Sequence, residues 1–179
     1  MAELGPDWQR GPDGLPYRRA ARVILLDEAD RVLLVRGHDV DQPSRTWWFT
    51  VGGGIDTGET SREAAVRELR EETGITLWAD DLVGPVYTRS ALFDFFARLC
   101  RQDEELFLAR VRSSDLTPLT HDAWTDLEAD VLDELRWWSV DELETVDIEM
   151  FPAGLPALVR SLLPGWDGIT RHLGLARET

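Results

Sequence analysis

Short apolar runs separated by polar turns fill the first third of the chain. Residues 22–26 (RVILL) and 31–36 (RVLLVR) flank a polar turn at 27–30, and this pattern predicts two paired strands. Residues 47–51 (WWFTV) predict a further strand. We expect this strand to end at Gly52, because the three consecutive glycines at 52–54 are unfavourable inside a regular element.

The segment after the glycines carries the clearest helical pattern. Ser61–Thr73 follows polar residues that can start a helix, and Gly74 is suited to cap its C-terminus. Ala65, Val66 and Leu69 fall on one side of this helix. We therefore expect that side to pack inward.

Further strands and two short helices are expected in the second half of the chain. Alternating and apolar stretches in residues 86–111 predict a hairpin with its turn near Arg101–Glu104. An acidic connection follows over residues 113–133, and residues 136–140 (RWWSV) predict a late strand. Short helices are expected at residues 141–145 and 155–163.

Composition and charge limit the classes of function. The chain has 179 residues, 43% hydrophobic and 30% charged, which is typical of a soluble globular protein with one domain. The formal net charge of -15 argues against binding to nucleic acids or anionic membranes, because both attract basic surfaces. Neither a signal peptide nor an apolar stretch of membrane-spanning length is apparent, so we expect a cytoplasmic protein. Cys100 is the only cysteine, which excludes an intrachain disulfide.

Three glutamates on the expected helix are the candidate chemistry. Glu68, Glu71 and Glu72 span an arc of roughly 100°, so their carboxylates share one helix face. Carboxylate oxygens suit Mg²⁺ or Mn²⁺. The alternative interpretation is a solvated acidic face that arginines on the same helix balance. The upstream glycines favour the metal site, since they let backbone groups approach a cation or a phosphate.

Residues 53–75, GGIDTGETSREAAVRELREETGI, resemble the box of the Nudix hydrolase family without a gap. The matching positions are Gly53, Glu59, Arg67, Glu68, Leu69, Glu71, Glu72, Gly74 and Ile75. The family usually has Pro directly before the paired glycines, where this chain has Val51. This departure removes no ligand, and we expect only a small effect on the rigidity of the loop.

The resemblance implies an α+β fold of the α/β/α sandwich type, with a central mixed sheet and the box as a loop, helix and loop. On this basis residues 20–163 form the Nudix hydrolase domain. Residues 1–19, which are rich in Gly and Pro, are expected to be an irregular leader, and residues 164–179 a C-terminal tail.

The resemblance also implies roles for the residues of the box. It assigns the binding of Mg²⁺ or Mn²⁺ to Glu68, Glu71, Glu72 and the Gly53 carbonyl. It assigns catalytic roles to the same glutamates and to Arg67, which would orient them, while Glu59 would brace the loop. The base would be Glu68 or a more distal acid. In this family a fourth acid often lies before the late strand, and the candidates there are Glu128, Asp130, Asp133 and Glu134.

Residues beside the helix are candidates for substrate contacts. Arg36 ends the second expected strand, where the family often places a phosphate-contacting base, and Trp47 or Trp48 could stack on a nucleobase. The backbone of Gly52, Gly53 and Gly54 could approach a phosphate. Weaker candidates for a phosphate contact are Arg18, Arg19, Arg22 and Arg45.

The function that the resemblance implies is hydrolysis of a diphosphate linkage in a nucleoside diphosphate derivative. Pro85 and Tyr87 lie too close to the box to match the markers of ADP-ribose and dinucleoside polyphosphate hydrolases. A nucleoside triphosphate, normal or oxidised, therefore leads, with the monophosphate and pyrophosphate as products. Hydrolysis of nucleotide sugars, ADP-ribose or dinucleoside polyphosphates stays open. A Nudix-fold module that senses a nucleotide without turnover is the non-enzymatic alternative, although the complete set of box glutamates favours an enzyme. The expected partner is a small nucleotide, and a homodimer is left open.

Overall fold

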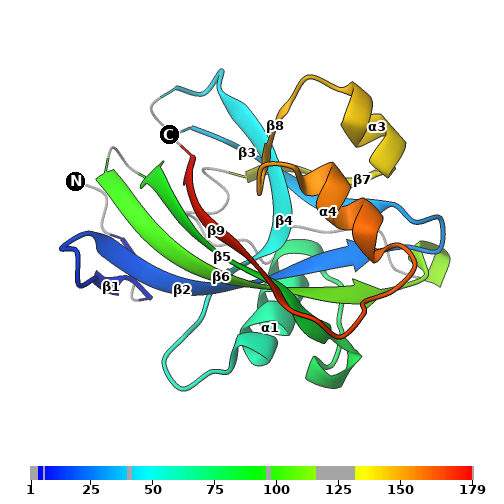
Figure 1. The fold of residues 1–179 in the computed structure, drawn as a ribbon, viewed down its shortest axis with the longest axis horizontal. Helices are drawn as coiled ribbons and strands as arrows, with labels where there is room; N and C mark the ends of the chain where they lie inside the picture. Colours follow the sequence, from blue (N-terminus) through cyan, green and yellow to red (C-terminus); the bar gives the residue numbers. More distant parts are fainter. Residues whose placement is uncertain (1–3, 6, 40–41, 96–97, 116–131, 179) are drawn as a thin grey trace.

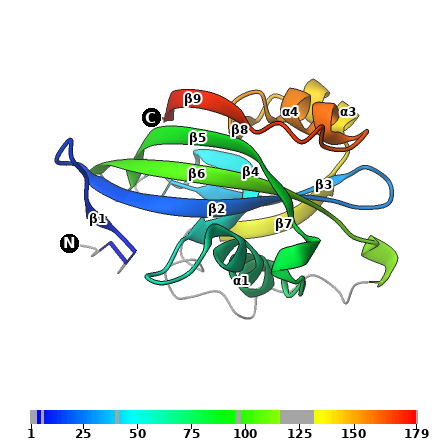
Figure 2. The same cartoon turned by 60° about the horizontal axis from the view of Figure 1, so that its bottom comes forward.

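The computed structural model describes residues 4–178 except 6, 40–41, 96–97 and 116–131. In this part of the chain a mixed sheet has α1 (Ser61–Thr73) on one face and α3 (Val140–Thr145) and α4 (Leu155–Leu162) on the other (Figures 1 and 2). The α+β sandwich is thereby confirmed. No helix among the described residues has the length and apolar character needed to cross a bilayer.

The order of strands places the N-terminal and C-terminal halves of the chain side by side. The sheet order is β7 (Leu132–Trp138), β3 (Val32–His38), β4 (Thr46–Gly54), β2 (Pro16–Leu26), β6 (Arg98–Arg110), β5 (Val83–Phe95) and β9 (Arg171–Glu178). In addition, β1 (Gln9–Arg10) pairs with β2, and β8 (Glu149–Phe151) pairs with β4. The pairs β2–β6, β4–β8 and β5–β9 are parallel, and the other pairs are antiparallel. Short 3₁₀ turns occupy Ala79–Asp81 and Ser113–Asp115.

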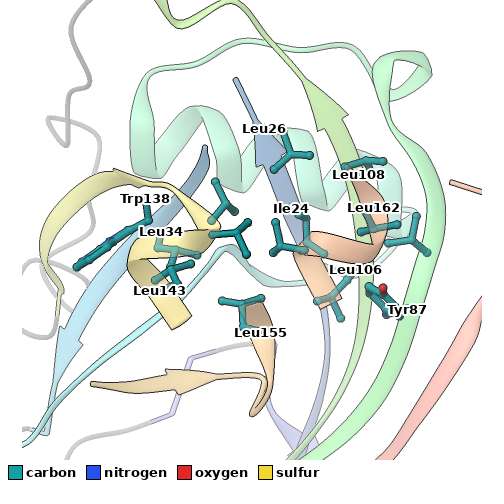
Figure 3. Close-up of a cluster of buried hydrophobic side chains, with 14 of the residues drawn as sticks. Ile24, Leu26, Leu34, Tyr87, Leu106, Leu108, Trp138, Leu143, Leu155 and Leu162 are labelled. Atoms are coloured by element: carbon teal, nitrogen blue, oxygen red, sulfur yellow. The ribbon is translucent and has the colours of Figure 1, made fainter. Parts of the chain in front are cut away.

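Alternation along the strands sorts the core into two clusters, one on each face of the sheet. Ile24 of β2 faces α3 and α4, where it lies in one cluster with Leu143 and Leu155 (Figure 3). Val23, one residue earlier, belongs to the cluster around Leu69 of α1. Because successive side chains of a strand point to opposite faces, each central strand contributes to both clusters.

The strand that carries the glycines continues through them. Gly52 and Gly53 pair with Arg22 and Ala21 of β2. Gly52 has φ 140°, and a Cβ on it would lie 2.2 Å from the carbonyl oxygen of Ala21. The prediction that the strand ends at Gly52 is therefore wrong, because the glycines allow β2 and β4 to approach more closely than side chains would permit.

The predicted position of the turn in the hairpin is also wrong. β5 ends at Phe95 and β6 begins at Arg98, so residues 101–104 lie inside β6. Gln102 and Glu104 are buried there, in phase with the apolar Leu106. The polarity of Gln102 and Glu104 suggested a turn, whereas the alternation of buried and partly exposed side chains along the strand continues through both residues.

The two ends of the chain are more regular than expected. Pro16–Arg19, which were expected to be irregular, belong to β2, and residues 171–178 of the expected tail form β9. The runs at 22–26 and 31–36 form strands as predicted. Their direct pairing, however, is limited to one pair of residues, Leu26 and Val32. Instead, β4 lies between them and pairs with residues 20–23 of β2 and 34–38 of β3, while β2 pairs along most of its length with β6.

Candidate active site

Local hydrogen bonds fix the start and the end of α1. The Thr60 side chain accepts from the backbone N–H of Glu63, and the Glu63 carboxylate accepts from the backbone N–H of Thr60 at 2.8 Å. At the other end Gly74, with φ 77°, donates its N–H to the Arg70 carbonyl. This capping box and glycine cap set the helix bounds that the sequence predicts. The resulting phase buries Glu68 and Glu72 and leaves Glu71 partly exposed.

The Arg67 guanidinium joins the acidic groups of the site. Its Nε and Nη2 donate to the two carboxylate oxygens of Glu59, each at 2.9 Å. Nη1 donates to Glu68 at 2.7 Å and to Glu71 at 3.1 Å. Nη2 also donates to the Gly54 carbonyl at 2.9 Å. One planar cation thus holds three carboxylates of the box beside the end of β4.

Glu72 and Glu68 connect the helix to the glycines of β4. The Gly52 N–H donates to Oε2 of Glu72 at 2.9 Å in a buried hydrogen bond. A Cβ on Gly53 would lie 2.6 Å from Oε2 of Glu68. Any side chain at position 53 would therefore displace the Glu68 carboxylate or the strand.

The ion pair between Arg67 and Glu59 dominates the local electrostatics. Hydrogen bonding to Arg67 lowers the pKa of Glu59 and outweighs the opposite effect of burial. In return, hydrogen bonding to Glu59 and the charge of Glu68 raise the pKa of Arg67 above its usual range. Both groups are charged at neutral pH, so Arg67 offsets part of the negative charge of the glutamates.

The oxygen donors of the site suit a hard divalent cation. Glu68 lies against Gly53, which no Cβ screens, and carboxylate and carbonyl oxygens are the ligands that Mg²⁺ and Mn²⁺ prefer. Among the described residues, no three acidic, His or Cys side chains converge closely enough to hold an ion by themselves. Arg67 binds oxygens of Glu68 and Glu71 in this arrangement. Mg²⁺ usually needs only one or two carboxylates beside water and substrate phosphate, so the donor set fits.

Arg36 pairs with acids of β7. Its Nη1 lies 3.1 Å from Glu134 and its Nε 3.5 Å from Asp133, and its side chain is about one-third exposed. The structure therefore gives Glu134, a predicted fourth acid, an ion-pair partner. Glu128 and Asp130, the other candidates in this connection, lie outside the described residues.

The two adjacent tryptophans of β4 have different environments. Trp48 is only 6% exposed and its ring meets that of Trp138 edge-on at 5.1 Å, so it packs in the core rather than on an open face. Trp47 is partly exposed, with its ring 6.3 Å from that of Phe151 and the Arg45 guanidinium 5.5 Å from its centroid. Of the two, Trp47 is the one with surface left for a base.

Sequence reasoning missed two polar groups beside the glycines, one largely buried and one fully buried. Arg22, expected at most to contact a phosphate, donates to the carbonyls of Thr50 and Gly52 at 2.9 and 3.0 Å. Its Nε donates to Glu104 at 2.6 Å, and Glu104, expected in a turn, is 2% exposed. The available signal was the phase of Glu104, which shares its strand face with the buried Leu106.

The model of the NUDIX domain family matches residues 16–159, and the chain therefore belongs to this family. An RNA pyrophosphohydrolase from Erythrobacter litoralis is 31% identical over 138 residues, which cover 69% of this chain and 83% of that protein. A Bacillus subtilis protein provisionally named 8-oxo-dGTP diphosphatase is 41% identical over 78 residues, or 44% of this chain and 48% of that protein.

Other curated relatives match over a shorter part of their sequence. The chain spans less than half the length of the first relatives that it matches. Among solved structures, that of a mutator MutT protein from Bacillus halodurans superposes with a TM-score of 0.57 at 23% identity, over 87% of this chain and 89% of that chain. At this level of identity the likeness establishes the fold.

Proposed function

We propose that the protein is a metal-dependent hydrolase that cleaves a diphosphate linkage in a nucleotide. The observation that carries the proposal is the cluster in which Arg67 binds Glu59, Glu68 and Glu71 while Glu72 binds the Gly52 N–H. Membership of the NUDIX family and the diphosphate-hydrolysing names of its relatives support it.

Each residue of the cluster has a proposed role in metal binding, orientation or proton transfer. The proposed ligands of Mg²⁺ or Mn²⁺ are Glu68, Glu71, Glu72 and the Gly53 carbonyl. A bound cation would supply positive charge that offsets the charge developing on phosphoryl oxygens. Arg67 orients Glu68 and Glu71, and Glu59 holds Arg67 in place. The proposed general base, which accepts the proton of the attacking water, is Glu68 or a more distal acid such as Glu134.

The proposed substrate is a nucleoside triphosphate, normal or oxidised, which yields the monophosphate and pyrophosphate. A chain with a net charge of -15 is poorly suited to bind a long polyanion, whereas a small nucleotide needs only local compensation of its charge. The relative named 8-oxo-dGTP diphosphatase favours the same class. Arg36 and Trp47 are the proposed contacts to phosphate and base, and the glycine backbone at 52–54 is a further phosphate contact.

Conservative changes of the box glutamates test the proposed activity. We expect Glu71→Gln and Glu72→Gln each to lower the Mg²⁺-dependent release of phosphate or pyrophosphate more than tenfold, because metal charge is central to the reaction. Glu63→Gln on the same helix is the matched control, since Gln preserves the capping box and we expect an unchanged rate. Normal rates in both box variants would count against the site.

The substrate class is tested by comparing nucleotides under one set of conditions. The panel contains normal and oxidised (d)NTPs, ADP-ribose, dinucleoside polyphosphates, nucleotide sugars and an RNA with a terminal triphosphate, each with Mg²⁺. We expect the highest kcat/KM for a nucleoside triphosphate, with pyrophosphate as the second product. A clear preference for the RNA or for ADP-ribose would reassign the substrate within the family.

A further inference from the structure

A row of largely buried ion pairs crosses the sheet from its C-terminal strand towards the box. Glu178 of β9 pairs with Arg89 of β5, and Arg89 pairs with Glu104 of β6. Glu104 in turn pairs with Arg22 of β2 at 2.6 Å. The strands β9, β5, β6 and β2 are consecutive neighbours in the sheet (Figure 1), so each contributes one member of the row.

The row ends at the backbone that binds the box glutamates. Nη1 of Arg22 donates to the carbonyls of Thr50 and Gly52 in β4, the next strand of the sheet. The N–H of the same Gly52 donates to Glu72. A shift of the Arg22 guanidinium would therefore move the segment of β4 against which Glu72 is held.

All four side chains of the row are withdrawn from water. Their exposed fractions are 11% for Arg22, 1% for Glu104, 4% for Arg89 and 9% for Glu178. Desolvation makes buried ion pairs a weak source of stability. Burial raises the pKa of Glu178 and outweighs the opposite effect of the Arg89 charge, so the environment disfavours the charged form of this carboxylate. Apolar side chains in the same space would stabilise the sheet at least as well, so a row with fixed geometry that ends at the backbone of Gly52 is better explained by positioning.

We propose that Arg22, Glu104, Arg89 and Glu178 are positioning residues, through which the C-terminal strand β9 fixes the place of Gly52 and Glu72. β9 lies outside residues 16–159, which match the family model, so this dependence belongs to a segment beyond the family domain. The catalytic consequence rests on the proposed function, whereas the effect on Gly52 can be measured without substrate or metal.

The experiment measures amide hydrogen exchange at Gly52 by NMR in the apo protein, together with kcat and KM. Arg22→Lys keeps the charge but lacks the planar group that reaches Glu104 and two carbonyls. Glu178→Gln removes the charge at the far end of the row. Asp167→Asn is the matched control, because Asp167 forms an exposed pair with Arg171 in the same C-terminal segment.

We expect exchange at Gly52 to be at least tenfold faster in Arg22→Lys and at least threefold faster in Glu178→Gln, and unchanged in Asp167→Asn. The double variant should exchange no faster than Arg22→Lys alone, because the two residues act in series. The variants should lower kcat with KM unchanged within about twofold. Wild-type exchange in both single variants, or additive effects in the double variant, would overturn the proposal. Either result leaves the proposed hydrolysis untouched, since the box variants test that separately.

Discussion

At the scale of single residues, Arg67 is the side chain on which most of the site depends. Its five-donor guanidinium binds Glu59 through two parallel hydrogen bonds and still reaches Glu68, Glu71 and the Gly54 carbonyl. A lysine would keep the charge but has no planar fork with which to hold several acceptors at once. The geometry of this group should therefore matter more than its charge.

We expect Arg67→Lys to lower kcat by about 10- to 100-fold, the usual effect of losing a group that orients metal-binding residues. The Mg²⁺ concentration that gives half of the maximal rate should be higher in the same variant. Steady-state kinetics across a Mg²⁺ titration measure both effects. Arg70→Lys, an exposed position on the same helix, should behave like the wild type. Equal kinetics for the two lysine variants would argue against an orienting role for Arg67.

Residue-level features were predictable where they depend on local spacing. The shared face of the three glutamates and the glycine cap follow from the helical period, and the structure has the helix at the expected bounds. The contacts of Arg22 were not predictable in this way. They depend on the parallel pairing of β2 with β6, which brings Glu104 beside a residue 82 positions away in the chain. No local pattern encodes such a register.

At the scale of elements, the close approach of β2 and β4 places the glycines against α1. Gly52 has no room for a side chain, since its Cβ would lie 2.2 Å from the Ala21 carbonyl oxygen and 2.6 Å from Cα of Arg22. Its φ of 140° is also unfavourable for other residues. Both effects act on the strand pair that carries the backbone of the site.

We expect Gly52→Ala to lower the free energy of unfolding by more than about 3 kcal/mol, from backbone strain and steric overlap together. Gly58→Ala is the matched control, because Gly58 also has a positive φ, of 85°, but no atom lies within 4 Å of its Cβ position. That variant should lose only about 1–2 kcal/mol. Urea unfolding measures both values, and similar losses in the two variants would show that strain alone, and not the packing of β2 on β4, makes glycine necessary.

The elements were predicted better than their limits and partners. The first strands and α1 occur where the local pattern indicates them, whereas the late strand, predicted at residues 136–140, lies at Leu132–Trp138 and is followed by α3 from Val140. The hairpin turn was misplaced, since Gln102 and Glu104 are polar yet buried, where they bind Arg18 and Arg22 of β2. The strand β9 was missed for a similar reason. Its residues are mostly exposed at the edge of the sheet, so they carry little apolar alternation.

At the scale of the whole molecule, a strongly acidic chain folds around a charged group that water does not reach. The net charge is -15, and most acids among the described residues are exposed or partly exposed. Like charges repel one another at neutral pH, and the net negative charge falls as the pH approaches the pI of about 4.5. Glu104 behaves differently. Burial alone raises its pKa, but the charges of Arg22 and Arg89 outweigh burial and lower the pKa from 4.5 to about 2.

A lowered pKa in the folded state gives this carboxylate a defined range of pH in which it stabilises the fold. Its contribution is complete above the unfolded-state pKa of 4.5 and is lost as the pH falls from there towards 2. We expect Glu104→Gln to lower the free energy of unfolding by about 3 kcal/mol at neutral pH, since it removes the charged partner of Arg22 and one of the two charged partners of Arg89. Urea unfolding of both proteins as a function of pH should show this difference shrinking below pH 4.5.

Glu144→Gln, which removes an exposed partner of Arg160, should show no resolvable difference at any pH. A gap of the same size at neutral pH and near pH 3 would mean that the packing of Glu104, and not its charge, stabilises the centre of the sheet.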